Sequence, residues 1–199
     1  MTAAAVRIAA LATAAAALLC GCGSSSSSTT SSSSADVAVT VNGTAVPLSL
    51  YTSIVEATRQ RIEEVTGVPI DTKTAEGRTR LADLERTTLK DLVRDAAIDQ
   101  LATQRHIAVS DADLDVALKR VASGLGGTST LSEDIDQSRL DPGTFRTLYR
   151  YVVLSQRLRD ADPAGFDTAL NDAVSRAQVL AYAAPCDGAN HTYPACAGG

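Results

Sequence analysis

The sequence has no tryptophan, one methionine and two phenylalanines among its 199 residues. Because aromatic residues make up only 4% of the chain, large rings cannot supply the bulk of a buried interior. The hydrophobic residues, 45% of the total, are mostly aliphatic, and many of them are alanine. The sequence therefore predicts a core of Leu, Val, Ile and Ala side chains.

Histidine is scarce, with only His106 and His191 in the chain. A hydrolase requires a nucleophile paired with a base, and neither histidine stands in a nucleophile elbow or a comparable motif. Serine and aspartate are plentiful, but no motif arranges them as a catalytic set. We therefore expect no catalytic residues, no cofactor and no enzymatic activity.

Metal and phosphate motifs are incomplete. The acidic run from Asp111 to Asp115 matches the opening of a calcium loop, but Val116 and Ala122 occupy the places that require Gly and Glu. We interpret the run as the first turn of a helix, where the helix dipole favours negative charge. The glycine-rich Gly124 to Thr128 follows a predicted helix rather than a strand, so it predicts a flexible connection and not a phosphate cradle.

Clusters of lysine and arginine are also absent, and the formal net charge is −5. Proteins that bind nucleic acid or an anionic lipid surface through electrostatics usually carry such a cluster. We therefore expect neither nucleic acid nor charged lipid headgroups as partners.

An apolar run from Ile8 to Leu19 follows the single cation Arg7, which is the layout of a secretory signal peptide. The run is too short to span a bilayer as a stable helix. The segment Leu19 to Cys22 at its end resembles the bacterial lipobox, with Leu three places before the modified cysteine and Gly directly before it. The alternative is an ordinary signal peptide cut near Gly23.

The lipobox resemblance implies that residues 1–21 are removed and that Cys22 becomes an acylated N-terminus. Loss of the one cation Arg7 changes the formal net charge from −5 to −6. Two or more acyl chains hold a protein durably on a bilayer, so we expect a lipid anchor on the extracytoplasmic face of the cell membrane. Residues 22–35, which contain only Ser and Thr from Ser24 to Ser34, are expected to form a disordered tether.

Two further cysteines, Cys186 and Cys196, lie in the C-terminal tail, residues 184–199. In an oxidising compartment we expect them to form a disulfide. Closing so short a loop contributes about 3 kcal/mol in the chain-entropy model. Two free thiols are the alternative, and a zinc site is disfavoured because His191 adds only one ligand.

The first strands and the first helix follow from periodicity. Residues 37–41 alternate as a strand does, and Asn42-Gly43 supplies a hairpin turn. A helix that opens at Pro47 or Ser49 then ends at Gly67. Its predicted buried face consists of Tyr51, Ile54, Val55, Ile62 and Val65.

Four more helices are predicted along the chain. The longest covers residues 76–105, and the next starts at a capping box formed by Ser110 and Asp113. The polar linker that follows can form a short helix near residues 131–137. Two more helices start at Asp141-Pro142 and Asp162-Pro163, and the second leads to an apolar strand that could pair with the first strand. That last strand covers Val179 to Tyr182, and the buried stripe of the helix after Asp141 is predicted as Phe145, Leu148, Tyr149, Val152 and Leu158.

This order of elements resembles the N-terminal chaperone module of the SurA and PrsA family of extracytoplasmic chaperones. The resemblance is carried by Val39 to Gly43 with Val46 and Tyr51, by Leu89 to Asp111, and by Phe145 to Leu158. These segments cover most of residues 37–158. In that family a parvulin-type prolyl isomerase domain commonly follows the last of these helices. Here only Arg159 to Gly165 precede the next predicted helix, so we expect that domain to be missing.

The resemblance implies a mainly α fold over residues 36–183, a SurA-N-like helical domain of about five helices with a small sheet formed by N- and C-terminal strands. It implies a membrane-anchored holdase chaperone that binds unfolded or partly folded secreted polypeptides. The alternative is an adaptor lipoprotein that uses this fold to dock one envelope protein, and a prolyl isomerase is less favoured. The residues that would bind the client are not identified by the resemblance.

Overall fold

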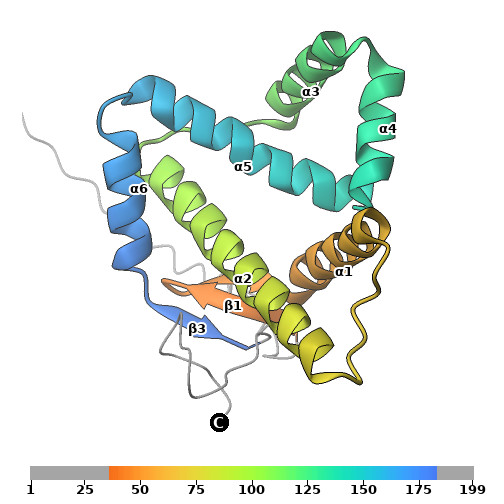
Figure 1. Cartoon of the computed structure of the whole chain (residues 1–199). Helices are drawn as coiled ribbons and strands as arrows, with labels where there is room; N and C mark the ends of the chain where they lie inside the picture. Colours follow the sequence, from red (N-terminus) through yellow and green to blue (C-terminus); the bar gives the residue numbers. More distant parts are fainter. Residues whose placement is uncertain (1–35, 183–199) are drawn as a thin grey trace, which may run out of the picture. The chain divides into compact units, whose positions relative to one another are not determined.

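The computed structural model describes residues 36–182, and most of this part of the chain is helical (Figure 1). The predicted mainly helical fold with a small sheet is confirmed. The short helix that the polar linker can form near residues 131–137 is present as α4, so the described residues form six helices rather than about five. In chain order the elements are β1 (Val37–Val41), β2 (Thr44–Pro47), α1 (Leu48–Thr66), α2 (Ala75–Gln104), α3 (Asp111–Leu125), α4 (Thr128–Ser138), α5 (Pro142–Ala161), α6 (Phe166–Ser175) and β3 (Val179–Ala181).

The sheet has the strand order β2-β1-β3, and both pairings are antiparallel. A two-residue turn joins β1 to β2, and its residues Asn42 and Gly43 have φ values of 51° and 80°. Positive φ at both central positions is the requirement of a type I′ hairpin turn, which explains the Asn-Gly pair.

The C-terminal strand closes the other edge of β1, as the sequence predicted. Val39 lies opposite Ala181, and Val41 lies opposite Val179. The Tyr182 amide extends the pairing by donating to the main-chain oxygen of Ala38 at 2.9 Å. The two ends of the described chain are therefore joined in one sheet.

Side-chain caps fix where several helices begin. Thr74 accepts a hydrogen bond from the Gly77 amide at the start of α2, and Asp141 accepts one from the Thr144 amide at the start of α5. The predicted capping box of Ser110 is present at the start of α3. Each cap satisfies an amide that has no partner within its own helix.

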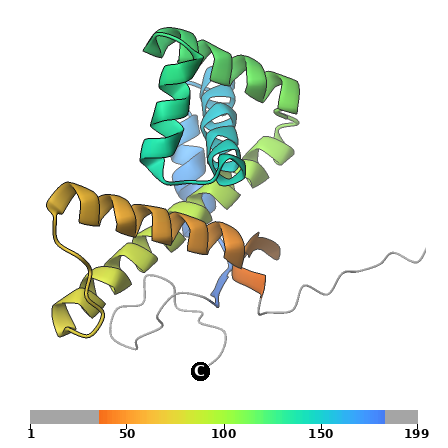
Figure 2. The ribbon, with the colours of Figure 1, turned by 90° about the vertical axis from the view of Figure 1, so that its right-hand side faces the viewer.

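The long helix α2 serves two hydrophobic clusters in succession (Figures 1 and 2). Its residues up to Ala96 pack with the sheet and α1, and its residues from Ala97 onward pack with α3, α5 and α6. Figure 2 shows α2, in yellow to light green, rising from below α1 to those helices. Leu92 and Val93 are buried in the first cluster, and Leu154, Leu158 and Phe166 are buried in the second.

Two residues that the sequence placed in the core are exposed, and those predictions are wrong. Val65 is 79% exposed because the buried residues of α1 all lie in its first half, so its last turn covers no core. Val152 is 57% exposed because the buried side of α5 runs through Leu154 and Leu158 instead.

Candidate functional site

Two large apolar side chains are exposed on the facing helices α3 and α5. Val116 of α3 and Val152 of α5 are each 57% exposed. Both line one groove of about 560 Å³, which we call the α3–α5 groove. Its volume falls within the range of roughly 300 to 1,000 Å³ that is typical of ligand pockets. The groove is lined by Asp113, Val116, Ala117, Arg120, Val121, Tyr149, Val152, Val153, Gln156, Arg157 and Asp160.

The groove is lined by apolar residues, which we call its floor, and by charged residues, which we call its border. Valines from both helices and Tyr149 supply the floor, and Tyr149 stacks on Phe145 one turn earlier in α5, with ring centroids 6.2 Å apart. Aspartate and arginine side chains supply the border. Binding surfaces for polypeptides commonly combine an apolar centre with such a polar rim.

The start of α3 is held against α5 by Arg157. Its guanidinium lies 2.9 Å from the Asp113 carboxylate and donates a hydrogen bond to the main-chain oxygen of Ala108. Asp113 also accepts hydrogen bonds from the amide and hydroxyl of Ser110 in the capping box. Hydrogen bonds from Arg157 and Ser110 hold the pKa of Asp113 well below its usual range, so this carboxylate stays ionised.

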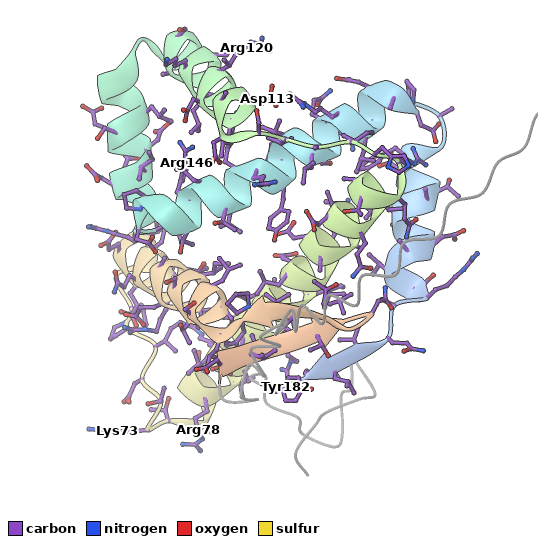
Figure 3. All side chains as sticks on the ribbon, turned by 180° about the vertical axis from the view of Figure 1, so that it is seen from behind. Lys73, Arg78, Asp113, Arg120, Arg146 and Tyr182 are labelled. Atoms are coloured by element: carbon purple, nitrogen blue, oxygen red, sulfur yellow. The ribbon has the colours of Figure 1, made fainter. Side chains whose placement is uncertain are left out.

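A second ion pair joins the same two helices. Arg146 of α5 lies 2.7 Å from the Asp115 carboxylate of α3. Exposed ion pairs of this kind contribute about 0 to 1 kcal/mol each, so they set the orientation of the helices more than their stability. Figure 3 labels Arg146 on α5, with Asp113 and Arg120 on α3. Among residues 36–182, Arg120 has no hydrogen-bond or ion-pair partner, which leaves a free cation on the border of the groove.

The α3–α5 groove was not predicted from the sequence. The periodicity of α5 predicted a buried Val152, and in α3 Leu114, Leu118 and Val121 lie three or four residues apart and form one apolar stripe. Val116 falls outside that stripe. An apolar residue on the polar side of an amphipathic helix was the one sequence signal for an exposed apolar surface on α3. The sequence does not show that α5 supplies the rest of the groove.

The other residues that the sequence singled out lie outside the α3–α5 groove or at the start of α3. Asp111 and Asp113 lie in the first turn of α3, as predicted. The prediction of one flexible connection from Gly124 to Thr128 is wrong, because Gly124 lies in the last turn of α3 and Thr128 begins α4, which leaves only Gly126 and Gly127 between the two helices. His106 is exposed in the turn after α2, with a φ of 55°. Within residues 36–182 no three His, Cys, Asp or Glu side chains are grouped closely enough to hold a metal ion.

The predicted signal peptide, the acylated Cys22, the tether, and the pairing of Cys186 with Cys196 lie outside the described residues, as does His191. These remain predictions. In the part of the chain from residue 36 to 182, no helix has both the length and the apolar character needed to cross a membrane.

Comparison with known families identifies a match over most of the chain. The SurA-like N-terminal domain family matches residues 2–159, from near the start of the chain to the end region of α5. Comparisons with curated proteins and with solved structures gave no match. The family match covers well over half of the chain and includes the hairpin, α2 and both helices of the α3–α5 groove. The chain therefore belongs to the SurA-like N-terminal domain family, whose fold is associated with a chaperone-type role and with the binding of client polypeptides.

Proposed function

We propose that this protein is a membrane-anchored extracytoplasmic holdase that keeps unfolded secreted polypeptides from aggregating by binding them in the α3–α5 groove. Val116 and Val152 carry the proposal, because two exposed apolar side chains face one groove from separate helices. Burying an exposed valine against a client side chain contributes about 1 kcal/mol or more. Weak contacts of this size suit a chaperone that must release its client.

The groups that line the groove suit the binding of a polypeptide chain. Its apolar floor suits Leu, Val or Phe side chains of an extended chain, and Arg120 can meet a main-chain carbonyl or an acidic side chain. The proposal uses no cofactor, no catalytic residue and no attached isomerase domain. Acceleration of prolyl isomerisation in a peptide assay would contradict that part of it.

Aggregation of a denatured client tests the groove directly. The full-length protein is expected to suppress light scattering at near-stoichiometric amounts, and the double variant Val116→Ser, Val152→Ser is expected to lose most of this effect. Val65→Ser is the matched control, because Val65 is an exposed helical valine outside the groove. Equal activity of all three proteins would refute the α3–α5 groove as the client site.

Cross-linking in cells separates the holdase from the adaptor alternative. A photoreactive residue at position 116 or 152 is expected to capture many unrelated secreted chains. One dominant partner would instead identify an adaptor that docks a single envelope protein.

The anchor is tested at Cys22. Labelled palmitate is expected to enter the wild-type protein and not the Cys22→Ser variant, which should leave the membrane fraction. Labelling of neither protein would support the ordinary signal peptide.

A further inference from the structure

A second pocket, of about 480 Å³, lies between α1, the loop before α2 and the first half of α2. Val55 of α1, Ile70 of the loop and Leu81 of α2 supply apolar walls. Arg78 fixes the loop by donating to the main-chain oxygen of Lys73 at 3.0 Å, and both residues are labelled in Figure 3. This hydrogen bond joins the loop before α2 to α2 itself, so two walls of the pocket are held in place relative to each other.

Two polar groups at this pocket have unmet hydrogen-bonding capacity. Tyr51 is only 4% exposed, and its hydroxyl has no hydrogen-bond partner among the described residues. Glu85 also lines the pocket, and no residue between 36 and 182 donates a hydrogen bond to its carboxylate. The two groups lie close enough for the Glu85 charge to raise the pKa of Tyr51, second to the effect of burial. Leaving such groups unpaired is costly, so a ligand that pairs with both would gain affinity.

The other charges at the pocket are already paired with each other. Arg59 lies 2.7 Å from Glu56 and 2.7 Å from Glu63, and Gln60 donates to Glu56 as well. Glu85 is therefore the carboxylate at this pocket that accepts no hydrogen bond from the described residues, although the charge of the adjacent Arg86 acts on it.

We propose that this pocket, which we call the Tyr51 pocket, binds one Lys or Arg side chain of a client polypeptide. The methylene stem would lie along Val55, Ile70 and Leu81, and the cationic head would donate to the Glu85 carboxylate and the Tyr51 oxygen. Long basic side chains bury their stems in this way while the charge keeps polar partners. An acidic side chain is excluded by Glu85. The proposal rests on the proposed client binding and adds to it a preference for basic residues.

Two peptides that differ only in charge test the preference. Each is an unstructured, end-capped peptide of Ala, Val and Ser with one central residue, which is Arg in the first and the uncharged isostere citrulline in the second. Full-length wild-type protein is expected to bind the Arg peptide about tenfold more tightly, as for one charge-assisted pair. Glu85→Gln should remove that difference, and Glu133→Gln, an exposed change of equal charge on α4, should retain it.

Tyr51→Phe supplies a readout that a purely structural role would not give. Removing an unpartnered buried hydroxyl should raise the midpoint of thermal unfolding by about 4 °C. The same variant should bind the Arg peptide several-fold more weakly. A tyrosine needed only for packing would not show improved stability together with weaker binding.

The outcomes separate this inference from the proposed function. If Glu85→Gln binds both peptides as wild type does, while the Val116→Ser, Val152→Ser variant binds neither, the Tyr51 pocket is not a basic-residue site and the holdase proposal stands. If no variant alters binding of either peptide, both proposals fail.

Discussion

Asn42 and Gln178 lie 136 residues apart in the chain and exchange two hydrogen bonds of 2.8 Å. The Asn42 amide donates to the Gln178 main-chain oxygen, and the Gln178 amide donates to the Asn42 side-chain oxygen. The Asn42 side chain also donates to Gln100 of α2 at 2.7 Å, and Gln100 donates to the main-chain oxygen of Val41. One turn residue thus connects the hairpin, the last strand and the longest helix.

Substitution of Asn42 should therefore destabilise the domain beyond the effect of a surface change. We expect Asn42→Ala to lower the free energy of unfolding by about 2 to 3 kcal/mol, from lost hydrogen bonds and from a positive φ that Ala disfavours. Asn42→Gly keeps the backbone conformation accessible and should cost only about 1 kcal/mol. Chemical denaturation measures both, and a loss under about 0.5 kcal/mol for the Ala variant would contradict the linking role.

Gly77 is predicted to tolerate no side chain. A Cβ there would lie 1.9 Å from the main-chain oxygen of Asp71, and backbone cannot move aside as a side-chain tip can. Gly77→Ala should lower the free energy of unfolding by about 2 to 3 kcal/mol. The control is Gly124→Ala in α3, where nothing lies within 4 Å, and its expected effect is a gain of about 0.5 kcal/mol. Similar melting temperatures for the two variants would contradict the prediction, because they would show that the loop around Asp71 moves to make room for the added methyl group.

Asp95 should make stability depend on pH. Burial, followed by the neighbouring Asp91 charge, raises the pKa of Asp95 from its usual 3.8 to about 7, with Arg94 opposing, and Tyr151 of α5 faces the same group. The native state therefore disfavours the ionised form, and this penalty grows from about pH 4 to pH 7.

The variant Asp95→Asn removes that penalty. We expect it to raise the free energy of unfolding by about 1 to 2 kcal/mol at pH 8 and to match wild type near pH 4. Asp99→Asn, an exposed position one turn later in α2, should change stability by less than about 0.5 kcal/mol at either pH. A gain that is equal at pH 4 and pH 8 would point to packing and not to ionisation.

The sequence predicted the features that depend on interactions between residues close together in the chain. The Asn42-Gly43 turn, the Ser110 capping box and the Gly67 end of α1 rest on neighbours within a few residues, and all three are as predicted. The pairing of residues 179–181 with β1 was also predicted, since a short apolar strand needs a partner. The exposure of Val152 depends on which side of α5 meets α2 and α6, and periodicity alone does not determine that choice.

The candidate site could not be predicted from the sequence either, because it depends on which sides of two helices meet. The α3–α5 groove is formed by residues of two helices, and its exposed valines Val116 and Val152 are 36 positions apart in the sequence. The Tyr51 pocket depends on Glu85 approaching from a different helix. Neither arrangement leaves a motif in the chain.

Ser110 should matter more than an average exposed serine. Its hydroxyl accepts a hydrogen bond from the Asp113 amide at 3.1 Å, so Ser110→Ala should cost about 1 kcal/mol of stability by loosening the start of α3. Ser123→Ala is the control, because that hydroxyl only bonds back to Lys119 within the same helix. Thermal denaturation should show a lower midpoint for the first variant alone, and a matching drop in the second would remove the special role of the cap.

The central position of β1 in the sheet affects how the chain folds during synthesis. Its first partner, β2, follows within a few residues, but its second partner is the last strand of the described chain. During vectorial synthesis, one edge of β1 must stay unpaired until more than 130 further residues have emerged. The newborn chain is itself aggregation-prone over that interval, in the same condition as the clients we propose it protects.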